Sequence, residues 1–138
     1  MKSYPVVGDY MTPSPHSIGF DQSVETAQTL MRRYNIRHLP VQCAGELIGI
    51  VSDRDIKFAL AWERNPERQL SVEDVYIPDP FVVAPTTPLE NVVAVMAEGK
   101  IGSALVLENK KLVGIFTTTD ACRAFYKKLV AGLEGLPL

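Results

Sequence analysis

The sequence predicts an α+β fold made of two β-α-β-β-α repeats related by pseudo-twofold symmetry. Two observations predict it. An offset of 65 residues aligns the halves without a gap and places Asp9 on Asp74 and Asp55 on Asp120. In both halves, apolar residues at three- and four-residue spacing alternate with short apolar runs typical of strands. A repeat kept in register from Asp9 to Asp55 implies two copies of one supersecondary unit.

Each copy begins with a proline-rich turn and a short extended piece, at residues 17–20 or 81–84. A helix follows, and its apolar positions form one buried stripe. In the second copy, Thr87 is the predicted N-cap, Pro88 occupies the first helical position and Glu90 completes a capping box. The stripe positions are Val24, Ala27, Leu30, Met31 and Tyr34 in the first copy, and Leu89, Val92, Val93 and Met96 in the second.

Two apolar runs separated by short loops then predict a hairpin in each copy. Pro40, inside the first run, predicts an edge strand. A second helix is predicted over 53–62 and over 118–130, the latter closing near Gly132. The runs are 38–43 and 47–52 in the first copy, and 103–107 and 112–117 in the second.

The copies are predicted at residues 7–62 and 72–131, joined by a charged linker at 63–71. A three-stranded sheet would leave one apolar face bare, so each copy is expected to bury that face against its twin. The sequence therefore predicts one two-lobed domain with clefts along the junction of the copies.

Composition excludes several classes of protein. With 14 basic and 16 acidic residues the net charge is −2, and neither sign forms a long run, so neither nucleic acid nor a membrane is an expected partner. Cys43 and Cys122 lack the spacing of a zinc site and the density of a disulfide scaffold. Without a signal peptide or a membrane-spanning stretch, the expected location is the cytoplasm. No nucleophile, base and metal combination is evident, so neither catalysis nor a bound metal is expected.

The most informative motif is duplicated. Residues 49–55 and 114–120 each run glycine, two apolar residues, a hydroxyl residue, two variable positions and aspartate, where a strand becomes a helix. A helix N-terminus suits a phosphate because its backbone N–H groups are unpaired there. The aspartates, Asp55 and Asp120, can accept hydrogen bonds from a ribose diol. The alternative is structural, since Ser or Thr followed three residues later by Asp is also an ordinary capping box.

The pattern resembles a tandem pair of CBS domains, also called a Bateman module, over roughly Val7 to Phe125. The duplicated motif and the segments 36–41 and 101–106 carry the resemblance. It implies a regulatory ligand of the adenine-nucleotide type, AMP, ADP or ATP, and no cofactor. It also implies a homodimer and a protein target that the sequence does not identify.

The resemblance implies two ligand-binding clefts, each built from both copies. In related proteins apolar residues sandwich the adenine, the aspartate holds the ribose, and hydroxyl or basic residues hold the phosphate. The first cleft would contain Thr12, His16, Ile18, Ile36, Arg37 and His38 with Thr117, Thr119 and Asp120. The second would contain Phe81, Val83, Ile101, Gly102 and Ser103 with Ser52, Arg54 and Asp55.

The two clefts are not expected to be equivalent. Arg37 and His38 bring cationic donors to the first, whereas the aligned Gly102 and Ser103 bring none to the second, which has only Arg54 in the motif itself. A phosphorylated ligand is therefore expected to bind more tightly at the cleft that contains Asp120. As alternatives, Arg37 is a surface residue and His38 a histidine at the edge of the core.

Two further readings of the chain stay open. It can be a dimerisation module that has lost its ligand and keeps the motif as helix caps, or a sensor of S-adenosylmethionine. Trp62, Phe125 and Tyr126 are expected to pack between the repeats or in a dimer contact.

Overall fold

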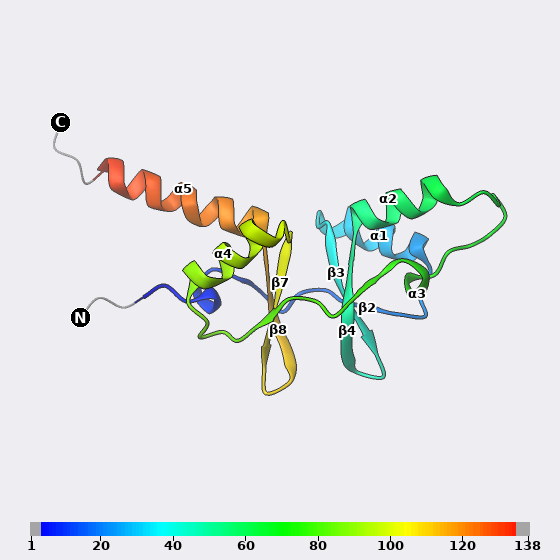
Figure 1. Ribbon diagram of the computed structural model, residues 1–138, viewed down its shortest axis with the longest axis horizontal. Coiled ribbons are helices and arrows are strands. Elements are labelled where there is room, and N and C mark those ends of the chain that lie inside the picture. The colour runs from blue at the N-terminus through cyan, green and yellow to red at the C-terminus, as the bar shows by residue number, and fades with distance from the viewer. Residues whose placement is uncertain (1–3, 135–138) are drawn as a thin grey trace. The chain divides into compact units, whose positions relative to one another are not determined.

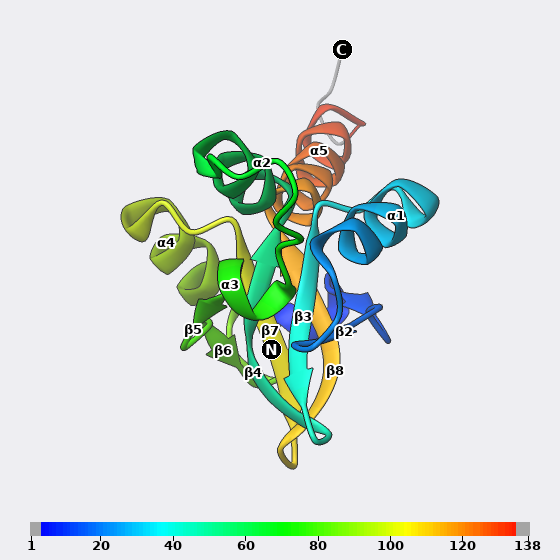
Figure 2. The same ribbon diagram turned by 90° about the vertical axis from the view of Figure 1, so that its right-hand side faces the viewer.

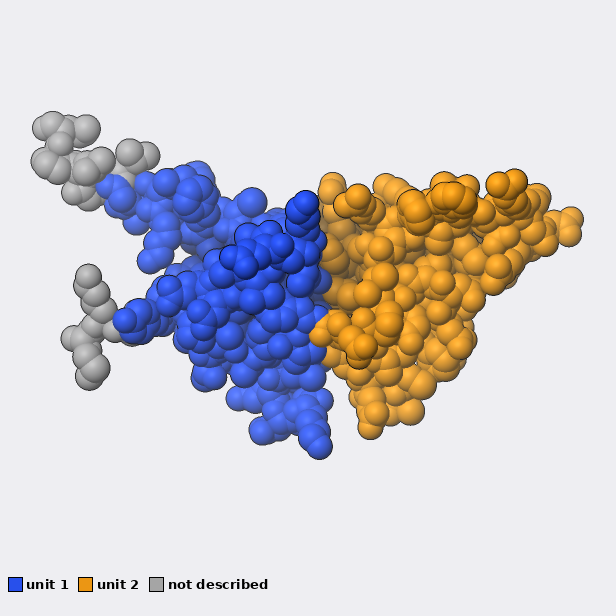
Figure 3. Space-filling model, in the orientation of Figure 1, with its two compact units in different colours: residues 1–14, 81–138 blue, residues 15–80 orange. Residues whose placement is uncertain are grey.

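The structure, a computed structural model that describes residues 4–134, confirms the predicted α+β fold. Its residues cluster into two compact units (Figure 3). Unit 2 is Pro15–Pro80, and unit 1 combines the described residues up to Ser14 with those from Phe81 onward. Each unit holds one four-stranded sheet.

Unit 2 is built around an antiparallel hairpin. Strands β3 (His38–Cys43) and β4 (Glu46–Ser52) form it, β2 (Ile18–Gly19) joins β3 in parallel, and β5 (Ile77–Pro78) joins β4 antiparallel. Its helices are α1 (Val24–Tyr34), α2 (Asp53–Trp62) and α3 (Val72–Val75). The turn between β3 and β4 lies at the end of the sheet away from α1 and α2 (Figures 1 and 2).

Unit 1 repeats this plan at the same offset. The hairpin is β7 (Ser103–Glu108) and β8 (Lys111–Thr117), with β6 (Val82–Val83) parallel to β7 and β1 (Thr12–Pro13) antiparallel to β8. The helices are α4 (Leu89–Gly99) and α5 (Thr118–Glu134), preceded near the N-terminus by the short 3-10 helix η1 (Val7–Asp9). The predicted hairpins and helices are therefore confirmed, with shifts of a residue or so at their ends except at the end of α5.

The prediction of three-stranded sheets is wrong. Each sheet gains a fourth strand from the segment that opens the other copy, since β1 pairs with β8 and β5 pairs with β4. The opening helices follow the same exchange, because Val7 is buried in the core of unit 1 whereas Val72 and Val75 are buried in the core of unit 2. The sequence copies at 7–62 and 72–131 and the compact units therefore divide the chain at different places.

Glycine makes the exchange possible. Gly49 of β4 lies opposite Pro78, and Gly114 of β8 lies opposite Pro13. A side chain at Gly49 would collide with the backbone carbonyl of Ile77, and one at Gly114 with the sulfur of Met11. The motif glycines therefore have a structural role: they let the incoming segment approach the hairpin.

Each unit has its own hydrophobic core. Met31 is 4% exposed and Met96 is 5% exposed, so both are core residues as predicted. Tyr34, predicted in the buried stripe, is instead exposed and stacks on His16 with ring centroids 3.6 Å apart. It is the last residue of α1, directly before Asn35, whose left-handed backbone ends the helix.

The prediction that Pro40 marks an edge strand is wrong, because β3 lies between β2 and β4. Pro40 is fully buried opposite Ile50. The parallel ladder to β2 begins at Val41, one residue beyond Pro40. The N–H that proline lacks is therefore not needed in that ladder.

The predicted N-cap at Thr87 is also wrong. Helix α4 begins at Leu89, one residue later than predicted, with no side-chain cap and without the capping box expected from Glu90. The Thr87 hydroxyl instead accepts a hydrogen bond from the Ala84 N–H at 3.0 Å, and the Leu89 N–H donates to the carbonyl of Pro5 at 2.9 Å. The helix α5 runs to Glu134, past the predicted end at residue 130 and past Gly132, near which it was expected to close.

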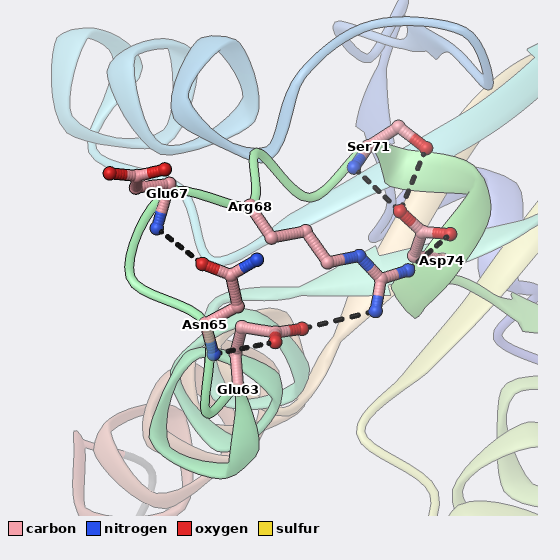
Figure 4. A network of polar contacts seen from close by, with 6 residues as sticks. All are labelled: Glu63, Asn65, Glu67, Arg68, Ser71 and Asp74. Carbon is pink, nitrogen blue, oxygen red and sulfur yellow. Dashed lines mark hydrogen bonds and ion pairs between the residues drawn. The ribbon is translucent and has the colours of Figure 1, made fainter.

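Polar contacts order the segment between α2 and α3 (Figure 4). Arg68 donates to Glu63 at 3.1 Å and lies 3.6 Å from Asp74. Asp74 in turn accepts from the backbone N–H of Ser71 at 2.9 Å, at the start of α3. The charged linker predicted from the sequence thus connects the end of α2 to the beginning of α3.

Candidate functional site

The first copy of the motif forms a closed helix start in unit 2. At the junction of β4 and α2, Asp55 Oδ2 accepts from the hydroxyl of Ser52 at 2.7 Å and from its backbone N–H at 3.2 Å. The Asp55 N–H donates back to the Ser52 hydroxyl at 3.1 Å, which completes a capping box. Arg54, between them, is exposed. The capping box that the sequence offered as the alternative to a ligand site is thus present at this junction.

The second copy is more heavily bonded. At the junction of β8 and α5, Asp120 Oδ2 accepts from the Thr117 N–H at 2.9 Å and from its hydroxyl at 3.2 Å. Asp120 Oδ1 accepts from the hydroxyl of Thr12 and from Nη1 of Arg123, both at 3.1 Å. Asp120 is only 5% exposed, so its charge is balanced by close donors rather than by water.

A polar hollow of about 280 Å³ lies beside Asp120 in unit 1. Thr12 and Pro13 line it from β1, and Arg123 and Lys127 line it from α5. The hollow therefore combines two cations with the hydroxyl of Thr12 and the carboxylates of Asp9 and Asp120. This is chemistry that suits a sugar phosphate.

Arg37 and His38 lie beside the motif of their own unit. His38 is paired with Ser52 across the β3–β4 ladder, and the Asp53 N–H donates to the carbonyl of Arg37 at 2.9 Å. Burial lowers the pKa of His38 below its ordinary value. The charge of Asp55 opposes that shift and the charge of Arg37 adds to it. His38 is thus a half-buried histidine that responds to the charges at this junction.

The equivalent strand start in unit 1 has no cation. Ser103 lies opposite Thr117 across the β7–β8 ladder and is buried, and the Thr118 N–H donates to the carbonyl of Gly102 at 3.2 Å. Ile101, just before, is partly buried. Thr119 is exposed on the first turn of α5.

The apolar residues predicted to sandwich adenine mostly belong to the cores. Ile18 is 4% exposed and lies in the core of unit 2, against which Ile36 also packs. Phe81 and Val83 pack against the core of unit 1. His16 is exposed and stacks on the ring of Tyr34.

Unit 2 thus contains His16, Ile18, Ile36, Arg37, His38, Ser52, Arg54 and Asp55, and unit 1 contains Thr12, Phe81, Val83, Ile101, Gly102, Ser103, Thr117, Thr119 and Asp120. Within unit 1 the structure brings Thr12, Thr117 and Asp120 together by hydrogen bonds. The assembly of clefts from both copies stays a prediction.

Sequence reasoning missed Arg123 and Lys127. Arg123 lies three residues after Asp120 on α5, a spacing at which helical side chains meet, so the signal was present in the sequence. Lys127 follows four residues later on the same helix. Both became candidates only once the hollow beside Asp120 was located.

Over residues 4–134, no three histidine, cysteine, aspartate or glutamate side chains are grouped so that they could hold a metal ion. None of the helices in the same range is both long enough and apolar enough to span a membrane.

Comparisons with known proteins agree with the repeat. The family model of the CBS domain matches residues 7–61 and again residues 72–127. A solved protein described as an acetoin utilization protein (AcuB), from Vibrio cholerae, is 31% identical with a TM-score of 0.83, covering 98% of this chain and 100% of that one.

Two similar structures were solved with adenosine compounds. The CBS domain pair of protein MJ0100, in complex with 5′-methylthioadenosine and S-adenosyl-L-methionine, is 26% identical with a TM-score of 0.82, over 91% of this chain and 99% of that one. CBSX2 in complex with AMP is 30% identical with a TM-score of 0.74, over 91% and 98%.

An enzyme matches over part of its length. The inosine-5′-monophosphate dehydrogenase of Korarchaeum cryptofilum is 34% identical over 124 residues, which make up 89% of this chain and 23% of the dehydrogenase. This chain therefore spans about a quarter of the length of that relative.

Proposed function

This chain belongs to the CBS-domain family, and from that premise we propose that it is a non-catalytic regulatory module that binds an adenosine-type ligand. The observation that carries the proposal is the duplicated motif, whose aspartates lie in the first turns of α2 and α5 at equivalent positions. The similar pairs solved with AMP, with 5′-methylthioadenosine and with S-adenosylmethionine support this ligand class. A partner protein of unknown identity would detect whether the ligand is bound.

We assign the ribose to the aspartates and the phosphate to the cations beside them. At Asp120 the ribose diol would replace the bonds from Thr12 and Arg123, and would free Arg123 for the phosphate. The remaining contacts are proposed to come from both copies, in the two sets of residues given above. The proposed location is the cytoplasm.

The phosphorylated ligand is proposed to favour the site that contains Asp120. At the 65-residue offset, Arg123 corresponds to Phe58 and Lys127 to Trp62, so both cations of the hollow are replaced by aromatic residues beside Asp55. Without these cations, the Asp55 site offers a phosphate fewer charged donors on its helix.

Thermal unfolding with AMP, ADP, ATP, S-adenosylmethionine and 5′-methylthioadenosine tests the proposal. A ligand of the folded state at 100 times its Kd raises the free energy of unfolding by about 2.7 kcal/mol. Asp120→Ala is expected to remove most of the response to AMP, and Asp55→Ala less of it. Asp53→Asn, which removes the ion pair with Lys57 and leaves both motif aspartates in place, is the matched control.

A melting temperature unchanged by all five ligands would reject the proposal. It would favour a second function, a dimerisation module without a ligand. The capping box at Ser52 and the bonds between Thr117 and Asp120 are the observation behind that function, because they show that the motif can be satisfied by the chain itself. Equal loss of AMP binding in Asp55→Ala and Asp120→Ala would reject the proposal that the phosphorylated ligand favours the Asp120 site.

We further propose that the protein forms a homodimer. Helices α2 and α5 carry large exposed apolar side chains, including Trp62, Phe125 and Tyr126, each about two thirds exposed and outside both cores. Aromatic residues of this kind are enriched in interfaces. Light scattering coupled to size exclusion measures the mass, and a monomer at micromolar concentration would exclude the dimer.

A further inference from the structure

Unit 1 contains a second hollow, which is apolar and larger than the one beside Asp120. Its volume is about 480 Å³, and it lies between the N-terminal segment, α4 and α5. None of the residues predicted to bind the nucleotide lines it. Its apolar walls include Pro5, Leu89, Val93, Ala121, Ala124 and Phe125.

Unit 2 fills the equivalent region with side chains. At the 65-residue offset, Ala121 corresponds to Ile56 and Pro5 to Leu70. Ile56 is fully buried and Leu70 is 7% exposed, and both belong to the core of unit 2. Smaller residues at these two positions leave unit 1 open where unit 2 is packed. Tyr10, which replaces a valine, adds volume in unit 1, yet the hollow remains.

The wall formed by the N-terminal segment is held in place. The Val7 N–H donates to the carbonyl of Thr87, and the Leu89 N–H donates to the carbonyl of Pro5, both at 2.9 Å. An isolated bridge between Val6 and Pro88 continues this pairing. The hollow is thus formed by hydrogen-bonded backbone, as in ligand sites that exist before the ligand arrives.

Two charged side chains decide which charged groups a ligand of this hollow would carry. Glu90 from α4 and Lys128 from α5 line the same hollow, and both are exposed. A ligand with one charge would be attracted by one of them and repelled by the other, whereas a zwitterion matches both. The phenol groups of Tyr4 and Tyr10 add polar atoms to an otherwise apolar surface.

We propose that this hollow binds a small zwitterionic molecule with an aromatic or branched apolar body, of the class of apolar amino acids and short apolar peptides. Its volume lies in the usual range of small-molecule pockets, about 300–1,000 Å³. The alternative occupant is a second copy of this chain, because Phe125 also belongs to the surface proposed for the homodimer. The hollow shares Tyr10 and Ala124 with the one beside Asp120, so it adjoins the proposed nucleotide site and would give unit 1 a second input.

Four probes test the site by nuclear magnetic resonance titration of the whole chain: L-tryptophan, indole-3-acetate, tryptamine and indole. Tryptophan is expected to bind most tightly of the four, and its binding is expected to shift the amide signals of Ala121 and Ala124. The probes that lack one charge are expected to bind about two- to fivefold more weakly, because exposed ion pairs contribute little. The variants Glu90→Gln and Lys128→Met are expected to remove this preference.

Ala121→Ile tests the location, because it installs the residue that unit 2 has at the equivalent position. It is expected to retain the fold and abolish tryptophan binding. Ala97→Ile, exposed on α4 and outside the hollow, is the matched control and is expected to bind normally. Failure of all four probes to bind, or equal binding to Ala121→Ile and the control, would overturn the site. A singly charged probe that binds more tightly than tryptophan would overturn the proposed preference for a zwitterionic ligand.

Discussion

Asp55 and Asp120 occupy the same place in the two copies but differ in what surrounds them. Both accept two bonds from the residue that caps their helix, and only Asp120 accepts further bonds from Thr12 and Arg123. The same motif therefore gives two carboxylates that accept different numbers of hydrogen bonds.

Replacing these aspartates with asparagine is expected to separate the two cases. In Asp120→Asn the new amide NH₂ would meet a donor in either orientation, the Thr117 N–H on one side or Arg123 on the other. The lost hydrogen bonds are expected to lower the free energy of unfolding by about 1–3 kcal/mol. In Asp55→Asn the NH₂ can turn away from Ser52, so a smaller loss is expected. Urea unfolding of both variants without ligand measures the difference, and equal losses would contradict it.

His38 is expected to make stability depend on pH. Burial lowers its pKa in the folded protein below the ordinary value of about 6.5. Once the pH falls below that value, the unfolded chain binds more protons than the folded one, so the free energy of unfolding decreases.

The measurement is the melting temperature between about pH 7.5 and pH 5. The melting temperature of His38→Gln is expected to fall less toward pH 5 than that of the parent chain. His16→Gln, at the exposed histidine, serves as the control. Parallel curves for the parent chain and His38→Gln would show that His38 does not cause the decline.

Part of the candidate site could be predicted at the level of single residues. The repeat located Ser52, Asp55, Thr117 and Asp120 because the motif is contiguous. The hydroxyl of Thr12 next to Asp120 could be expected only from family resemblance, since 108 residues separate the two in sequence. Such a contact depends on the fold, and no local pattern encodes it.

At the scale of the element, the long hairpins and helices were predictable, and so were the extended pieces that contain β2 and β6, whereas β1 and β5 were not. The apolar runs of β3 and β7 and the stripes of α1 and α4 are long enough to show a period. Strands β1 and β5 have two residues each, and in both the second residue is proline. They exist because a hairpin edge is available to them, which is a tertiary cause.

The motif glycines should differ in how well they tolerate alanine. Gly49→Ala is expected to lower the free energy of unfolding by about 2–3 kcal/mol, because its methyl group would meet the backbone carbonyl of Ile77. Gly114→Ala is expected to cost about 1 kcal/mol, because Met11 is a flexible side chain that can move away. Chemical unfolding measures both, and a larger loss for Gly114→Ala would contradict the account.

At the scale of the whole molecule, the exchange of opening segments predicts which fragment folds. Residues 15–80 contain all four strands of one sheet with α1, α2 and α3. Residues 1–65, of almost equal length, include the first sequence copy but lack β5 and α3, and so lose Val72 and Val75 from the core.

The 15–80 fragment is therefore expected to show dispersed amide signals and cooperative thermal unfolding, whereas the 1–65 fragment is expected to be less ordered. Circular dichroism and nuclear magnetic resonance compare them. A better folded 1–65 fragment would mean that the sequence copy, and not the compact unit, is the stable body.

The same exchange sets an order of events during synthesis. A ribosome delivers the segment from Pro5 to Ser14 before unit 2, but the strands and core that receive it come from Phe81 onward. Unit 2 can close while unit 1 is still being made, whereas the segment before it must wait until β7 and β8 have been synthesised. A segment that precedes unit 2 in synthesis is thus expected to reach its native position after unit 2 has folded.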